Sequence, residues 1–285
     1  MPTLRRVLPL KDDNPTRRPA VVTVALILVN VAVFVVLQQM QPGTDTVAAE
    51  VDTPTGPDAV AIEIPGALSF DLQYAAIPCE VTSREALTTD EVYATFVDGD
   101  GEACGADVGL GGHELFPDKR EWVAVLFSMF LHDGWVHLGG NMLFLWIFGN
   151  NIEDRLGRVR YLLFYLAGGL VAAGAHVAVQ PDATIPVIGA SGAVAAVMGA
   201  YLVWFPNARV RTLVVLLIMD VRAKWLLTFW FFFQFFTSPD DGVAWMAHVG
   251  GFAFGALVAL LVRASPRSRD LLWAPEHRAV DTWGA

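Results

Sequence analysis

Charged residues are scarce in this chain. Asp, Glu, Lys and Arg make up 17% of its 285 residues, whereas hydrophobic residues make up 54% and occur in long blocks. A soluble globular domain usually carries about 25% charged residues, so this composition excludes an ordinary soluble domain. The composition instead predicts a protein that crosses a membrane several times.

Basic residues are nearly missing from one long stretch, Met40 to Asp118. This stretch holds 16 acidic residues and a single basic one, Arg84. Charges at this density exclude a membrane span, because each charge placed at mid-bilayer costs roughly 2.5 to 3.5 kcal/mol. We therefore expect residues 40–120 to form an acidic loop or small subdomain outside the membrane.

Several catalytic motifs are also missing. The chain has neither a His-Glu-x-x-His sequence nor a Gly-x-Gly-Asp pair of membrane aspartates, and Ala193 interrupts a Gly-x-Ser-x-Gly elbow. These absences argue against zinc proteases, aspartyl proteases and α/β-hydrolases. We expect no metal, no cofactor and no nucleic-acid partner.

Six apolar blocks are candidates for membrane-spanning helices. They lie at 20–39, 136–152, 159–179, 188–206, 224–237 and 243–262, and 207–223 is expected to be a cytoplasmic or interfacial connection. With a cytoplasmic N-terminus, 16 of the 19 basic residues fall on the cytoplasmic side, and only Arg84, Lys119 and Arg120 fall outside. The positive-inside rule therefore predicts that both termini are cytoplasmic. A cleaved signal peptide is the alternative for 20–39, but the apolar stretch is longer than the usual signal core.

These blocks divide the chain into five predicted segments. They are a cytoplasmic N-terminal segment (1–19), a first transmembrane helix (20–39), an acidic extracytoplasmic loop or subdomain (40–120), a membrane core (121–263) and a cytoplasmic tail (264–285). Cys79 and Cys104 are the only cysteines, and both lie in the extracytoplasmic segment. An oxidising compartment favours a disulfide between them over two free thiols.

Two polar residues stand at the extracytoplasmic starts of predicted spans, Ser191 in the fourth block and His248 in the sixth. Small residues on the same helical faces would let the two helices approach closely: Ala195 and Gly199 on one, Gly251 and Gly255 on the other. A serine hydroxyl needs a base to become a good nucleophile, and neutral imidazole is the usual base near pH 7. A helix cap or a packing role is the alternative for either residue alone.

His137 and Asn141 form a third polar element, at the extracytoplasmic start of the second span. They are four residues apart and so lie on one helical face. Both side chains can donate hydrogen bonds, and a donor facing the negative oxygen of a tetrahedral intermediate contributes about 3 to 4 kcal/mol. Hydrogen bonding between helices is the structural alternative.

The segments Phe130–Met142, Gly189–Gly192 and Ala247–Gly251 resemble the three signature motifs of rhomboid intramembrane serine proteases, in the family's order. The resemblance covers about 120–262 and the first span. It implies an all-α membrane protein, a six-transmembrane-helix bundle with a long extracytoplasmic loop between helices 1 and 2. It further implies Ser191 as nucleophile and His248 as base. His137, Asn141 and the Ser191 backbone N–H would form the oxyanion hole, and Gly189 would shape the turn.

The sequence departs from the family pattern at the position four residues after the serine. Many rhomboids carry an aromatic residue there that stacks on the catalytic histidine, whereas this chain has Ala195. Other neighbours, such as Trp245 or Met246, would then orient His248. The long loop also lacks a Trp-Arg pair that many members carry. The resemblance therefore implies nothing about the role of this loop.

The predicted function is that of an intramembrane serine endopeptidase in the lipid bilayer, located in a bacterial plasma membrane. Its substrates would be transmembrane segments of other membrane proteins, cleaved near the outer interface. Weak helix formers there would let the scissile region unwind. One alternative is a proteolytically inactive rhomboid-like protein that binds membrane clients. A small transporter is disfavoured, because the polar groups gather at one end of their spans.

Overall fold

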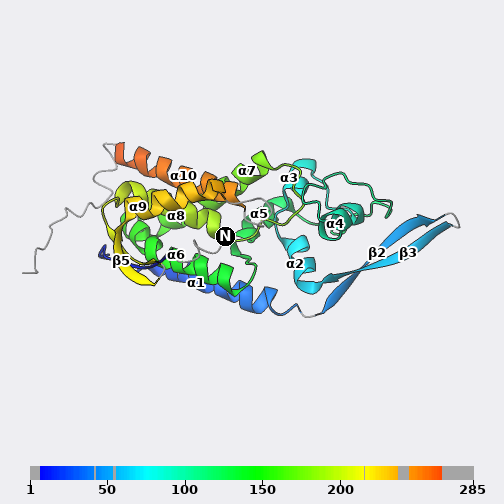
Figure 1. The fold of residues 1–285 in the computed structure, drawn as a ribbon, viewed down its shortest axis with the longest axis horizontal. Helices are drawn as coiled ribbons and strands as arrows, with labels where there is room; N and C mark the ends of the chain where they lie inside the picture. Colours follow the sequence, from blue (N-terminus) through cyan, green and yellow to red (C-terminus); the bar gives the residue numbers. More distant parts are fainter. Residues whose placement is uncertain (1–6, 42, 54–55, 215, 237–243, 265–285) are drawn as a thin grey trace, which may run out of the picture.

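The structure, a computed structural model, describes residues 7–41, 43–53, 56–214, 216–236 and 244–264. Its long helices run side by side in one bundle, with a smaller helical unit and a long hairpin at one end (Figure 1). A small sheet lies at the opposite end of the bundle. Residues 1–6 and most of the predicted tail lie outside the described residues.

The bundle helices follow the six predicted apolar blocks to within four residues at each end. They are α1 (Val21–Ala32) with its π-helical continuation η2 (Val33–Gln38), α6 (Trp135–Leu156), α7 (Arg158–Val179), α8 (Ser191–Trp204), α9 (Ala223–Phe233) with the 3-10 turn η4 (Gln234–Phe236), and α10 (Trp245–Ala264).

Within the described part of the chain, three helical stretches are long and apolar enough to cross a membrane. They are Val21–Gln38, Arg158–Val179 and Trp245–Ala264. Helix α8 is apolar but shorter, and α6 carries three charged residues in its last turn. The chain is therefore an integral membrane protein, and the count of six spans stays a prediction.

A three-stranded antiparallel sheet lies at one end of the bundle, in the order β1 (Val7–Asp12), β4 (Arg209–Val214), β5 (Leu217–Arg222). The chain is thus mainly helical rather than all-α. Asp12 ties the sheet to the helices, because its carboxylate accepts hydrogen bonds from Tyr201 Oη (2.8 Å) and Asn151 Nδ2 (2.6 Å). Burial raises the pKa of Asp12 to about 6.

The opposite end carries the strands β2 (Thr44–Thr53) and β3 (Gly56–Pro65) and the helices α2 (Gly66–Tyr74), α3 (Pro78–Ser83) and α4 (Thr89–Phe96). We call residues 44–118 the disulfide subdomain. A small apolar cluster of its own holds it together, including Leu72, Ile77 and Val92. Its β2–β3 hairpin projects away from the helices (Figure 1).

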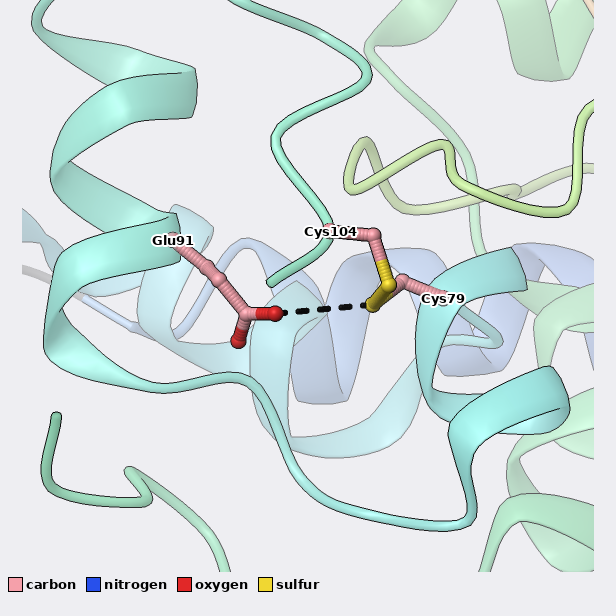
Figure 2. A group of neighbouring side chains, drawn as sticks. All are labelled: Cys79, Glu91 and Cys104. Atoms are coloured by element: carbon pink, nitrogen blue, oxygen red, sulfur yellow. Dashed lines mark hydrogen bonds between the residues drawn. A yellow bond between two sulfur atoms is a disulfide. The ribbon is translucent and has the colours of Figure 1, made fainter. Parts of the chain in front are cut away.

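Cys79 and Cys104 form a disulfide in this subdomain, with their Cα atoms 5.6 Å apart. The carboxylate of Glu91 lies beside it (Figure 2) and accepts hydrogen bonds from the backbone N–H groups of Gly105 (2.6 Å) and Thr88 (2.8 Å). Glu91 therefore holds the loop around Cys104 against the start of α4. Because the two sulfurs are bonded to each other, this cluster offers no thiolate to a metal ion.

The disulfide subdomain is hydrogen-bonded to the loop between α7 and α8. The backbone of Ala76 pairs with that of Val187, and the N–H of Cys79 donates to the carbonyl of Ala183 (3.0 Å). Ser128, after α5 (Glu121–Phe127), completes the connection. Its Oγ accepts from the Ala76 N–H (2.6 Å), and its carbonyl accepts from the Gly189 N–H (2.9 Å). One buried serine thus joins the subdomain to the turn that precedes α8.

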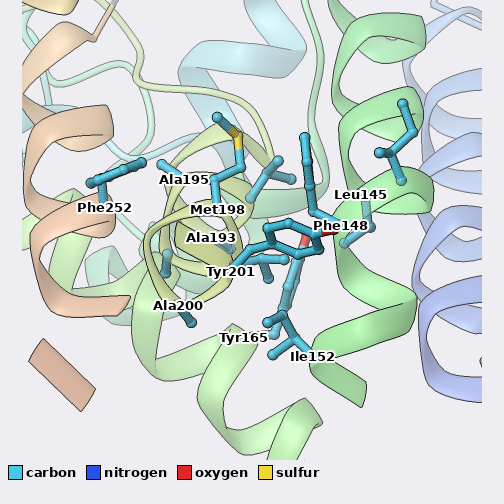
Figure 3. Packing of buried hydrophobic residues seen from close by; sticks show 14 of the residues in the cluster. Leu145, Phe148, Ile152, Tyr165, Ala193, Ala195, Met198, Ala200, Tyr201 and Phe252 are labelled. Carbon is cyan, nitrogen blue, oxygen red and sulfur yellow. The ribbon is translucent and has the colours of Figure 1, made fainter. Parts of the chain in front are cut away.

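Helix α8 lies at the centre of the bundle, and every residue from Gly192 to Tyr201 is buried. Side chains of α6, α7 and α10 pack around it, with Phe148 edge-on to Tyr201 (Figure 3).

Glycines bring the backbones of α8 and α10 into direct contact. A Cβ atom on Gly199 would overlap the carbonyl of Phe252, and one on Gly255 would overlap the carbonyl of Ala196. Likewise, a Cβ atom on Gly251 would overlap the carbonyl of Gly192. Three of the four small residues predicted to let these helices approach, Gly199, Gly251 and Gly255, therefore lie at their contact.

We expect Gly255→Ala to lower the free energy of unfolding by about 1 to 3 kcal/mol, because the new methyl group meets rigid backbone. Gly174→Ala in α7 is the control, since nothing lies within 4 Å of its added Cβ and alanine is the better helix former. Thermal unfolding in detergent micelles measures both. Equal midpoints for the two variants would contradict a tight α8–α10 contact.

We also expect Ser128→Ala to destabilise the fold by about 1 to 3 kcal/mol, because the buried N–H of Ala76 loses its acceptor. The matched control is Ser83→Ala, which removes an exposed serine that bonds only within its own turn. Denaturant unfolding compares the two. A loss no larger than that of the control would show that Ser128 does not couple the subdomain to the turn.

Candidate active site

Ser191 and His248 meet at the disulfide-subdomain end of the bundle. Ser191 is the first residue of α8, and His248 lies in the first turn of α10. Ser191 Oγ and His248 Nε2 are 2.8 Å apart, within hydrogen-bond distance. The α8–α10 contact described above sets this separation. The arrangement pairs a hydroxyl with an imidazole, which are the parts of a nucleophile and its base.

The turn before α8 depends on Gly189. Its φ of +124° lies in the region that residues with a side chain rarely adopt. A Cβ atom there would lie 2.9 Å from Nε2 of His137 and 3.5 Å from Oγ of Ser191. Gly189 thus leaves room for the His137 ring. No side chain caps the start of α8, so the backbone N–H groups of its first turn have no side-chain partner there.

One backbone hydrogen bond to the His137 ring fixes the position of its proton. The backbone N–H of Asp133 donates to His137 Nδ1 (3.3 Å), so this nitrogen is an acceptor. The neutral ring then carries its proton on Nε2, the atom that faces Gly189. His137 therefore presents an N–H donor to the turn that holds Ser191.

Asn141 is partnered within its own helix. Its Nδ2 donates to the carbonyl of His137, one turn earlier in α6 (3.1 Å). The amide nitrogen has a second N–H, which this bond leaves available. The structure thus brings His137 to the Ser191 turn, whereas the bond formed by Asn141 stays within α6.

The other face of His248 contacts α9 and η4. His248 Nδ1 is 2.7 Å from Gln234 Oε1, and the Trp230 ring lies 5.8 Å from the imidazole between centroids. Trp245, one of the two neighbours expected from the sequence, packs instead on Phe235. Asp240 and Asp241, which precede α10 in the sequence, lie outside the described residues.

Gln234 is the residue of this site that the sequence analysis missed. It is one of only two polar residues between Trp225 and Phe236, the other being Thr228. A polar group in such an apolar run is itself a signal of function. Its pairing with His248 could not be read from the sequence, because it joins separate helices.

His132 lies beside the site, with its ring 5.1 Å from that of His137 between centroids. It precedes α6, is almost completely buried, and burial lowers its pKa to about 4. His132 is therefore neutral near pH 7 and places no positive charge next to His137.

The chain matches the family model for the rhomboid domain over residues 119–265. It is 30% identical over 185 residues to rhomboid-type serine protease 2 of Emericella nidulans, which covers 61% of this chain and 35% of that protein. It is 29% identical over 152 residues to the Bacillus subtilis rhomboid relative YdcA (53% of this chain, 72% of YdcA). The match to rhomboid protease GluP of the same organism is 39% over 84 residues, 30% of this chain and 16% of GluP.

All residues of the candidate site named from the sequence lie inside the region that the family model matches. That region comprises 147 of the 285 residues and contains His137, Asn141, Gly189, Ser191 and His248. The chain belongs to the rhomboid family.

Proposed function

We propose that this protein is an intramembrane serine endopeptidase with Ser191 as nucleophile and His248 as base. The observation that carries the proposal is the 2.8 Å separation between Ser191 Oγ and His248 Nε2, in a bundle of apolar helices. Relatives with protease names support the same reaction class.

In the proposed reaction, Ser191 Oγ attacks a peptide carbonyl of the substrate while His248 Nε2 takes the hydroxyl proton. His248 then returns this proton to the leaving amine, and the acyl-enzyme forms. Water attacks the ester by the same route and releases the second product. Ser191 is only partly buried, which is compatible with entry of water and substrate from the subdomain end.

The negative oxygen of the tetrahedral intermediate needs hydrogen-bond donors. Nε2–H of His137 and the backbone N–H of Ser191, at the uncapped start of α8, are proposed to supply them. Asn141 would contribute through the N–H that its bond to the His137 carbonyl leaves available. Gly189 permits this arrangement because it has no side chain.

Substrates are proposed to be membrane proteins whose transmembrane segments contain weak helix formers near the outer interface. A helical carbonyl is tied to the backbone ladder, so it must be released before Ser191 can attack it. The proposed topology has six spans, cytoplasmic termini and an extracytoplasmic disulfide subdomain in a bacterial plasma membrane. The placement of the subdomain and the β1–β4–β5 sheet at opposite ends of the bundle agrees with that topology (Figure 1).

We expect Ser191→Ala and His248→Ala to abolish cleavage of single-span substrates and labelling by a fluorophosphonate probe. The first removes the nucleophile and the second its base. Thermal unfolding checks that both variants stay folded, and Ser83→Ala is the serine control. Cleavage by Ser191→Ala would refute the proposal. A wild-type protein that binds membrane proteins but neither cleaves nor labels would identify an inactive relative.

We expect His137→Ala and Asn141→Ala each to lower turnover by about 100- to 1000-fold, the usual effect of removing one oxyanion donor. Probe labelling should weaken in parallel, because the probe forms a similar tetrahedral centre. Steady-state cleavage assays measure turnover. Wild-type turnover in Asn141→Ala, with a loss only in His137→Ala, would restrict Asn141 to its bond within α6.

A further inference from the structure

We infer that Gln234 is a positioning residue that sets the tautomer and orientation of His248. The inference rests on the proposed function, because it treats His248 as the base. Its basis is a continuous run of three hydrogen bonds from the backbone of α9 to the serine. Gln234 Nε2 lies 3.0 Å from the carbonyl oxygen of Trp230, Gln234 Oε1 lies 2.7 Å from His248 Nδ1, and His248 Nε2 lies 2.8 Å from Ser191 Oγ.

The Trp230 carbonyl decides which atom donates in each of the three hydrogen bonds. A backbone carbonyl can only accept, so the atom of Gln234 that faces it must be the amide nitrogen. The amide oxygen therefore faces His248, and an oxygen there requires a donor at Nδ1. A neutral ring protonated on Nδ1 has an unprotonated Nε2. That nitrogen accepts the hydroxyl proton of Ser191, as a general base must.

The end of α9 makes the Trp230 carbonyl available for this bond. At the junction with η4, the backbone N–H of Gln234 bonds to the carbonyls of Phe231 and Phe232. The bond to Phe231 has the three-residue spacing of a 3-10 turn, so the Trp230 carbonyl does not receive the Gln234 backbone bond of a regular helix. The side chain of Gln234, which is 5% exposed, bonds to it instead. Both ends of the amide are thereby held.

Packing alone does not set the tautomer of His248. Ala195 offers no ring to the imidazole, and Trp230 contacts His248 with its ring plane tilted by 40°. A ring contact restrains the imidazole but does not distinguish its two nitrogens, whereas a hydrogen-bond acceptor at Nδ1 does. In serine proteases of water-soluble folds an aspartate holds the histidine in this way. A neutral amide suits an apolar helix better, because a charged carboxylate is costly there.

The test compares two substitutions at position 234 in the full-length protein. Gln234→Met has a similar length but no acceptor, whereas Gln234→Glu, in its neutral form, keeps an oxygen that can accept from Nδ1 and an O–H that can donate to the Trp230 carbonyl. We expect Gln234→Met to lower kcat by about 10- to 100-fold with little change in KM, and Gln234→Glu to restore most of the loss. The control is Thr228→Val, a loss of a polar group about 9 Å earlier in α9, which should keep wild-type kcat.

A wild-type kcat in Gln234→Met, a loss confined to KM, or an equal loss in both substitutions would overturn the inference. Nitrogen-15 NMR of histidine-labelled wild-type protein, with His248→Ala to assign the signal, tests it without relying on activity or on folding of the Met variant. The expected result is a protonated Nδ1 and an unprotonated Nε2, and the reverse would overturn the inference. Failure of the proposed function would appear differently, as a wild-type protein no more active than Ser191→Ala.

Discussion

The direct backbone contact between α8 and α10 is the constraint on which the rest of the site depends. Ser191 and His248 are both held at the starts of these helices, so the distance between their side chains follows from the distance between the helix backbones. Typical helix pairs are about 8 to 10 Å apart, separated by side chains. Glycines at the contact remove that separation. Within a bilayer such close packing also replaces the hydrophobic effect as the main attraction between helices.

A second constraint acts on the turn that leads into α8. Gly189 gives this turn its backbone conformation, and Ser128 connects it to the disulfide subdomain. Lys119, one of three basic residues predicted to lie outside the cytoplasm, is buried in an ion pair with Glu80 (2.5 Å). It also donates to the carbonyl of Leu72. The subdomain thus joins the bundle through partnered polar groups, and the contacts of Ser128 reach the turn that precedes Ser191.

Three polar side chains of the candidate site each have a hydrogen-bond partner in apolar surroundings. His137 receives a backbone N–H, Asn141 donates to a helix carbonyl, and Gln234 links another helix carbonyl to His248. An unpartnered polar group would be costly in such surroundings. The same bonds also decide which nitrogen of each ring carries a proton. Under the proposed function, the hydrogen bonds that satisfy these polar groups also prepare them for proton transfer.

The sequence by itself determined the positions of the bundle helices and of the candidate residues at their ends. Long apolar blocks predict helices because a membrane leaves the backbone few alternatives. A serine or histidine at the start of such a block stands out against its neighbours, as Ser191, His248 and His137 do. The glycines of the α8–α10 contact could be predicted for the same reason, since their spacing follows a helical face.

Only the tertiary structure decided the pairings between distant segments. Strand β1 pairs with β4 across about 200 residues, and neither segment has a local pattern that names its partner. The bonds of Asn141 to its own helix and of Gln234 to His248 depend on side-chain directions and helix separations. These quantities arise from packing of the whole bundle. A single sequence therefore places the candidate residues on their helices, while the folded structure determines which of their atoms meet.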